Sequence, residues 1–334
     1  MSKAKKKFFT YLFDRNFKGF RKGDLKKIDV INYSFGVIED GKVSLKLLEN
    51  HQEIIKTAHE ADVKVVLAIG GWGADGFSDA CLTKESRGEF IDSLIFAIKA
   101  YGFDGIDLDW EYPTTKAGGI VGREEDRENF TFLLSELRAA MDKLDEDLIL
   151  SIAVPANPHA ATKNYEIDKI NGFIDYLHLM SYDLINYTEL TSSHHANLLP
   201  SKNSFLSVAE ATDAYIKAGL DPEKIIVGIA FFGHLFNVDA NSTDGMREIA
   251  SSRMAITYKN IVKDYLNNDD YKVFYDEEAK ASWLYGKGVV ISYDNPRSIK
   301  AKCDYVVENN LGGVMNWEYG QDDEDSTLVK AIYF

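Results

Sequence analysis

YGFDGIDLDWEYP, residues 101–113, is the stretch that decides the fold. Successive side chains of a β-strand point to opposite faces, so Asp107, Asp109 and Glu111 share one face. The other face is apolar and bulky, with Ile106, Leu108 and Trp110. This pattern predicts a strand of a parallel sheet whose apolar face is covered by helices.

The row of three acids has two possible explanations. An acidic strand edge facing solvent is the simpler one in a chain with 53 Asp and Glu. A buried row is costly unless protons or hydrogen bonds are shared, because like charges at one site push their pKa values apart. Gly102 and Gly105 bracket the strand start, and Glu111 lies at the carboxyl end, where catalytic groups of parallel barrels collect. The context therefore favours a functional row.

Composition limits the class of protein. The 334 residues are 45% hydrophobic and 27% charged, which is enough for a large core in one elaborated domain or two smaller ones. The formal net charge of -15 argues against a nucleic-acid or anionic-membrane partner, and no apolar run approaches the length of a membrane span. Cys81 and Cys303 lack metal or redox spacing, so we expect buried, reduced thiols.

The first residues, MSKAKKKFFTYLFD, are basic and then briefly apolar. Thr10 interrupts the apolar run and no small-residue cleavage site follows, so the stretch does not resemble a signal peptide. This leaves the compartment open between the cytoplasm and export by another route.

Apolar, β-prone runs alternate with helical patterns along the chain. Seven strands are expected besides the acidic one, at residues 8–13, 30–35, 64–69, 148–154, 176–180, 225–230 and 311–317. Helices are expected at residues 47–61, 83–101, 126–144, 207–218 and 296–309. Eight strands alternating with helices predict an α/β fold, a closed (β/α)8 TIM barrel. The sequence contains no glycine-rich phosphate loop, so we expect no nucleotide cofactor.

One connection is too long for a barrel loop. Residues 234–288 follow the seventh strand and carry clustered aromatic residues. We expect them to form a small inserted α+β subdomain at the barrel mouth, with residues 1–233 and 289–334 forming the catalytic barrel.

The acidic row resembles the DGxDxDxE signature of the family 18 glycoside hydrolases, the chitinases. It stands here as Asp104, Gly105, Asp107, Asp109 and Glu111. Companion motifs follow in the expected order: INYSFG at 31–36, GG at 70–71, MSYD at 180–183, GIAFFG at 228–233 and GGVMNWE at 312–318. The resemblance covers nearly the whole chain and implies cleavage of chitin or chitooligosaccharides.

The chain departs from the family pattern at Ala68. The family usually has Ser at this position, two residues before the paired glycines, and its hydroxyl helps to hydrogen-bond the acidic row. The missing hydroxyl affects the tuning of Asp107.

Glycoside cleavage needs an acid that protonates the leaving oxygen, and we assign this role to Glu111. Its pKa is expected to be raised by neighbouring carboxylates and partial desolvation. Asp109 lies on the same strand, about 6.6 Å away by rise, so the two acids approach the sugar from one side. This favours what the resemblance implies, attack by the substrate's own 2-acetamido oxygen, with Asp109 bonding the acetamide nitrogen and sharing a proton with Asp107. By resemblance, Tyr182 holds the acetamide carbonyl.

The same resemblance supplies candidates for substrate binding. Asp183 would line the acetamide subsite and Trp317 would form its apolar floor, because an indole ring can stack on a sugar face. Met180 belongs to the same motif as Asp183. The other candidates, for which ordinary packing is the alternative, are Tyr11, Phe35 and Trp72.

Three alternatives remain at this point. The barrel could be a chitin-binding lectin with little activity, although the presence of Glu111 counts against it. It could be an endo-β-N-acetylglucosaminidase acting on N-glycans, which would use the same acidic row. The row could also hold Mg²⁺ through its oxygens. We favour a chitinase that is a monomer and needs no cofactor or metal.

Overall fold

The computed structural model describes residues 5–239 and 241–334, so residues 1–4 of the expected barrel segment and residue 240 of the insertion lie outside the description. Within the described residues, eight parallel strands pair in a ring. They are β1 (Lys7–Phe13), β2 (Val30–Glu39), β4 (Lys64–Gly70), β5 (Gly105–Asp109), β6 (Ile149–Pro155), β7 (Tyr176–Met180), β8 (Ile225–Ala230) and β14 (Gly313–Trp317). Because β1 pairs with both β2 and β14, the sheet closes, and the predicted TIM barrel is confirmed.

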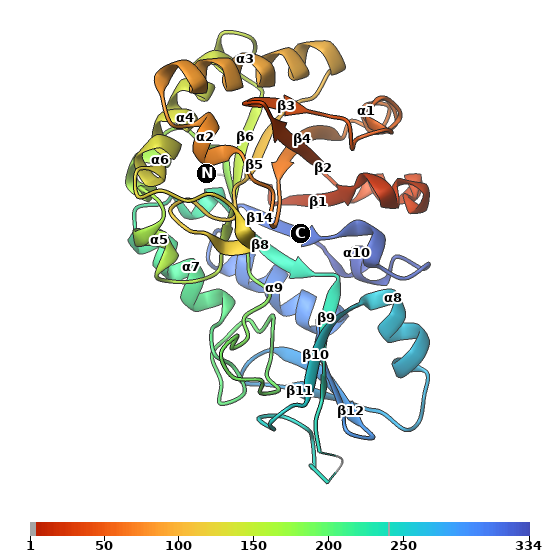
Figure 1. The fold of residues 1–334 in the computed structure, drawn as a ribbon. Coiled ribbons are helices and arrows are strands. Elements are labelled where there is room, and N and C mark those ends of the chain that lie inside the picture. Colours follow the sequence, from red (N-terminus) through yellow and green to blue (C-terminus); the bar gives the residue numbers. More distant parts are fainter. Residues whose placement is uncertain (1–4, 240) are drawn as a thin grey trace.

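Helices follow the strands and lie around the barrel (Figure 1). The longer ones are α1 (His51–His59), α3 (Lys84–Tyr101), α4 (Asp126–Asp142), α7 (Val208–Lys217) and α9 (Pro296–Glu308). The sequence predicted all five, but α1 begins four residues later than expected because a turn at 45–48 precedes it. The short elements β3 (Lys42–Ser44), α2 (Phe77–Ala80), α5 (Ala160–Lys163), α6 (Ile167–Ile170) and α10 (Thr327–Ala331) were not predicted.

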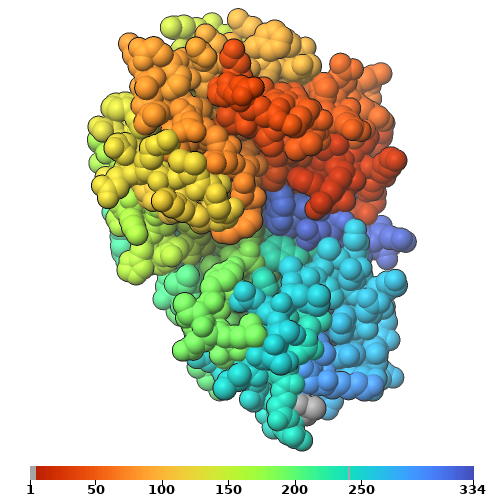
Figure 2. All heavy atoms as spheres, in the orientation of Figure 1, coloured from red at the N-terminus to blue at the C-terminus, as the bar shows by residue number. Residues whose placement is uncertain are grey.

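A second sheet is inserted after the seventh barrel strand. In the described part of the chain its five antiparallel strands are β9 (Phe232–Asn237), β10 (Ser252–Thr257), β11 (Lys272–Asp276), β12 (Ala281–Gly286) and β13 (Val289–Tyr293). The short helix α8 (Tyr258–Ile261) connects β10 to β11. This sheet forms a lobe below the red and orange part of the barrel (Figures 1 and 2). Its strands extend a few residues beyond the segment 234–288, whose role as a separate subdomain stays a prediction.

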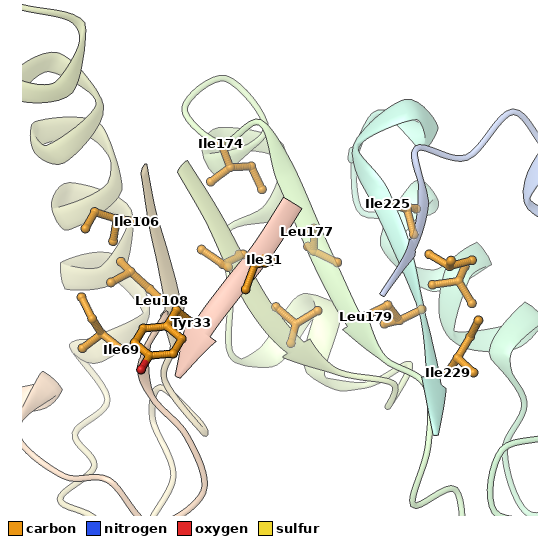
Figure 3. Packing of buried hydrophobic residues seen from close by; sticks show 14 of the residues in the cluster. Ile31, Tyr33, Ile69, Ile106, Leu108, Ile174, Leu177, Leu179, Ile225 and Ile229 are labelled. Carbon is orange, nitrogen blue, oxygen red and sulfur yellow. The ribbon is translucent and has the colours of Figure 1, made fainter. Parts of the chain in front are cut away.

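The apolar core lies mainly between the barrel strands and the helices. Ile106 and Leu108 of β5 are fully buried there beside Ile69 of β4 (Figure 3). A smaller cluster fills the barrel interior: Phe9, Tyr11, Val30, Val66, Ala68, Ile149, Ile226 and Met315. The alternating side chains of residues 105–111 therefore point to these two regions in turn: the apolar ones face the helices, and the acids face the barrel interior. Cys81 and Cys303 are buried and free, as expected. No helix in the described ranges is long and apolar enough to cross a membrane.

Trp110 anchors the outer face of the acidic strand. Its ring is buried, stacks on Phe77 at a centroid distance of 5.3 Å and meets Phe130 edge-on at 5.6 Å. These contacts fix the end of β5 against α2 and α4.

We predict that Trp110→Ala lowers the free energy of unfolding by about 3–5 kcal/mol, because it leaves a large cavity in the packed layer. Urea titration followed by circular dichroism measures the effect. Phe96→Ala is the control, since Phe96 is exposed on α3, and it should change stability by less than about 0.5 kcal/mol. Equal losses in the two variants would contradict this assignment.

Candidate active site

The three acids of the row lie at different depths. Asp107 and Asp109 are buried in the barrel interior, whereas Glu111 follows the end of β5 and is half-buried at the mouth. Depth therefore separates the acids into a buried pair and one group that solvent can reach.

Asp107 is held by hydrogen bonds from neighbouring and distant strands. The Tyr11 hydroxyl donates to Asp107 Oδ2 at 2.6 Å, and Asn32 Nδ2 donates to the same oxygen at 3.3 Å. The Ser151 hydroxyl donates to Asp107 Oδ1 at 2.6 Å. These donors stabilise a buried carboxylate that would otherwise be costly.

Ser151, on the other side of β5, compensates for the hydroxyl that Ala68 lacks. In the strand registers Asp107 pairs with Ala68 on β4 and with Ser151 on β6. Ser151 thus supplies a hydroxyl in the same layer of the barrel as Ala68.

Ser151, Asn32 and His178 are site residues that sequence reasoning missed. His178 is fully buried, and its Nδ1 lies 2.9 Å from the Tyr11 hydroxyl and 3.0 Å from Asn32 Nδ2. Burial lowers the pKa of His178, although the charge of Asp107 opposes this shift, so the ring is neutral. The available signal was a polar residue inside a largely apolar strand, which indicates an inward polar position but names no partner.

The glycine turn after β4 allows a close approach to Asp109. Gly70 has φ +109°, and a Cβ there would lie 2.3 Å from the Asp109 carbonyl oxygen. The Gly71 amide donates to that same oxygen at 2.9 Å. Only glycine at position 70 combines this backbone conformation with this contact.

Asp109 holds a proton more tightly than an ordinary aspartic acid. Burial raises its pKa well above the usual value, and the charge of Asp107 and hydrogen bonding to Asp107 raise it further. The Tyr11 hydroxyl, 3.3 Å from Asp109 Oδ1, acts in the opposite direction. Because the donors converge on Asp107, a proton shared by the pair rests on Asp109.

Glu111 also has a raised pKa, of about 7. Burial is the main cause, the charge of Asp183 adds to it, and a hydrogen bond with Tyr112 lowers it. Burial and a neighbouring carboxylate were the expected causes; the carboxylate is Asp183, after β7, and the charge of Glu111 in turn raises the pKa of Asp109. A carboxyl group with this pKa can give up and recover a proton near neutral pH.

Aromatic side chains gather above the acids. Trp317, half-buried at the end of β14, stacks on Phe35 with ring centroids 5.5 Å apart and planes 22° apart. Tyr182 lies close enough to Glu111 for that charge, after burial, to raise the pKa of its phenol, which therefore stays a hydrogen-bond donor. A stacked aromatic pair and a hydroxyl donor thus adjoin the acid row.

The remaining predicted residues lie at different distances from open solvent. Trp72 is 67% exposed after β4, with its ring 6.4 Å from that of Tyr112. Tyr11 is buried beneath the mouth, where it contacts the acids, and Met180 packs against the interior cluster. Asp183 is partly exposed, and His234 Nε2 lies 2.6 Å from its Oδ1.

Comparisons with known proteins identify the family. The sequence profile of glycosyl hydrolases family 18 matches residues 7–322. The chain belongs to this family. Chitinase A1 of Niallia circulans is 30% identical over 81% of the chain, and Chitotriosidase-1 of Mus musculus is 30% identical over 83%. The match covers 42% and 62% of these two relatives, so this family 18 chain spans only part of their length.

A solved structure is similar over its whole length. It is a family 18 N-acetylglucosaminidase from Paenibacillus barengoltzii, with a TM-score of 0.93 and 32% identity, and the match covers 98% of this chain and 99% of that one. The fold of the family 18 barrel and its inserted sheet is thus shared with an enzyme of the family.

We predict that Ser151→Ala lowers the free energy of unfolding by about 1.5–3 kcal/mol, because a buried hydrogen bond to a charged group is lost. Adding Ala68→Ser to this variant should restore part of the loss, since position 68 adjoins Asp107 from the other side. Urea unfolding of the single and double variants measures both effects. If Ala68→Ser restores nothing, position 68 does not reach Asp107.

The raised pKa of Glu111 predicts a pH-dependent stability. The folded protein keeps this proton up to a pH of about 7, whereas the unfolded chain releases it near 4.5. Ionisation therefore destabilises the fold as pH rises between these values, by up to about 3 kcal/mol. Glu111→Gln does not titrate, so its stability relative to wild type should increase from pH 4.5 to pH 7 and then level off. A constant difference, measured by thermal or urea unfolding, would show that the pKa is not raised.

Proposed function

We propose that this protein hydrolyses β-1,4-linked N-acetylglucosamine chains, as in chitin and its oligomers, by a retaining mechanism in which the substrate's acetamido group takes part. The observation that carries the proposal is the contrast between Glu111, with a pKa of about 7 at the mouth, and the buried, hydrogen-bonded pair Asp107 and Asp109. The proton of Glu111 can be transferred to the leaving oxygen, and the proton held by the Asp107–Asp109 pair can stay near the acetamido group.

In the first step, Glu111 gives its proton to the glycosidic oxygen while the acetamido oxygen attacks the anomeric carbon. The products are the released sugar and a positively charged oxazolinium ion. Asp109 hydrogen-bonds the acetamide nitrogen, and as positive charge develops, the shared proton moves toward Asp107, which leaves negative charge on Asp109 next to the cation. In the second step, Glu111 takes a proton from water, which attacks the same face from which the leaving group departed.

The surrounding residues orient the sugar. Tyr182 donates its hydroxyl to the acetamide carbonyl, which turns that oxygen toward the anomeric carbon. The Trp317 indole, held by its stack on Phe35, forms the floor under the sugar ring. Asp183 lines the same subsite, and the exposed Trp72 extends the binding surface beyond it.

A role for the row as a Mg²⁺ site is less well supported. Both carboxylate oxygens of Asp107 already accept hydrogen bonds from protein donors, which occupy positions that a metal ion would need. We expect turnover to persist when a chelator is added.

A second candidate function differs in the product. The solved N-acetylglucosaminidase with TM-score 0.93 makes the release of single N-acetylglucosamine units a specific alternative to cleavage into longer oligomers. Time-resolved product analysis on tetrameric to hexameric chains separates them, because one activity yields monomers throughout and the other yields short oligomers first.

We predict that Glu111→Gln reduces kcat/KM on these oligomers by about 10²–10⁴-fold, because the proton donor is lost. The exposed Glu124→Gln, in the loop after the motif, is the matched control and should hydrolyse like wild type. Wild-type activity should fall as pH rises through about 7, where Glu111 loses its proton. Substrate analogues without the 2-acetamido group should not be cleaved.

Other outcomes would identify other functions. Rapid hydrolysis of the plain glucoside would overturn the acetamido mechanism. Tight binding of the oligomers without cleavage by wild type would indicate a lectin. Neither binding nor cleavage would favour an N-glycan substrate.

A further inference from the structure

Three side chains of metal-ligand type meet beside the proposed substrate subsite. Asp183 follows β7, His195 lies in the long loop after it, and His234 lies on β9 of the inserted sheet. One ligand atom from each lies within 4.8 Å of the other two. The cluster therefore joins the barrel mouth to the insertion.

His195 is the unusual member of this cluster. Its side chain is fully buried, and neither ring nitrogen makes a hydrogen bond of ordinary geometry with the described residues, although the Phe232 backbone lies close to the ring. Its ring lies 5.0 Å from that of His234 and 5.3 Å from that of Phe232. A buried polar group left without a partner costs free energy, so a site this closed calls for an occupant that an imidazole nitrogen can bind.

The other two members add complementary properties. His234 is mostly buried and contacts Asp183 through Nε2, which fixes that nitrogen toward the carboxylate. Asp183 has a side-chain exposure of 41%, so the cluster opens to solvent through this residue. An ion can therefore reach the cluster from solvent at the Asp183 carboxylate and bind the imidazoles of His195 and His234, which lie deeper.

We propose that Asp183, His195 and His234 bind Zn²⁺. Two imidazoles and one carboxylate form a donor set that zinc prefers, and zinc commonly takes three protein ligands with an open fourth position. Tetrahedral ligands lie roughly 3.4 Å apart at the usual zinc distances of about 2.0–2.1 Å. The ligand atoms lie within 4.8 Å of one another, so the cluster reaches this geometry when they approach by up to about 1.4 Å, and the partly exposed Asp183 is the member least confined by packing.

The nearby cation does not oppose binding strongly. Lys302 approaches His195 from α9, but its ammonium group is buried in an ion pair with Asp294 at 2.5 Å. Its charge is therefore already balanced within the fold.

Zinc at this cluster inhibits the enzyme. Asp183 cannot bind sugar while it binds the ion. This consequence rests on the proposed function, because it requires Asp183 to contact the substrate. The binding of zinc itself does not depend on that role.

Isothermal titration with ZnCl₂, without substrate, tests the binding step. We expect one Zn²⁺ per wild-type chain and a Kd at least about 10-fold weaker in His195→Phe, which removes the buried ligand and retains a ring. His159→Ala, which removes an exposed histidine, is the matched control and should bind like wild type. Equal affinity in wild type and a folded His195→Phe variant would overturn the proposal.

A measurement on the wild type alone covers the case in which His195→Phe does not fold. Co²⁺ replaces zinc in tetrahedral sites and then absorbs visible light far more strongly than the hydrated ion. An intense spectrum that is lost on addition of Zn²⁺ supports the site, whereas the weak spectrum of a six-coordinate ion overturns it.

Hydrolysis assays test the inhibition separately. Zinc should raise the KM for oligomers without changing kcat in wild type, and the shift should be smaller in His195→Phe. Zinc-saturated protein with an unchanged KM would overturn the inhibition while leaving the binding result intact. A wild type that binds zinc and cleaves no oligomer would overturn the proposed function alone, because the titration needs no substrate.

Discussion

The hydrogen bonding of Asp107 inside the barrel is the interaction on which the site depends. A buried carboxylate is tolerated only when donors replace water, and here Tyr11, Asn32 and Ser151 do so. With Asp107 satisfied in this way, the proton of the buried pair rests on Asp109. In the barrel interior, Asp109 thus carries a proton and Asp107 a negative charge.

Closure of the barrel makes this arrangement possible. The donors to Asp107 come from β1, β2 and β6, and only β6 is a direct neighbour of β5. Tyr11 reaches the acids across the interior, where its ring also faces those of Trp317 and His178. An open sheet with the same strands would leave Tyr11 and Asp107 far apart.

The inserted sheet contacts the loop that follows β7. His234 of β9 contacts Asp183, and the charge of Asp183 is one cause of the raised pKa of Glu111. The insertion therefore affects the pKa of Glu111 through its contact with Asp183. The same junction brings His195 to His234 and creates the cluster to which we assign zinc binding.

The sequence by itself determined the elements and the faces of the acidic strand. Alternation over residues 105–111, glycine at the strand starts and helical spacing between strands are local patterns, and they predicted the eight barrel strands, the five longer helices and the inward acid row. The motifs also assigned Glu111, Asp183 and Trp317 to one site, an assignment that stays a prediction. Only the tertiary structure decided what surrounds each acid. The partners of Asp107 lie up to 96 positions away, and His178 lies 167 positions from Tyr11. A lone polar residue in an apolar strand shows that it points inward, but strand order and register choose its partner, and these depend on the closure of the whole barrel.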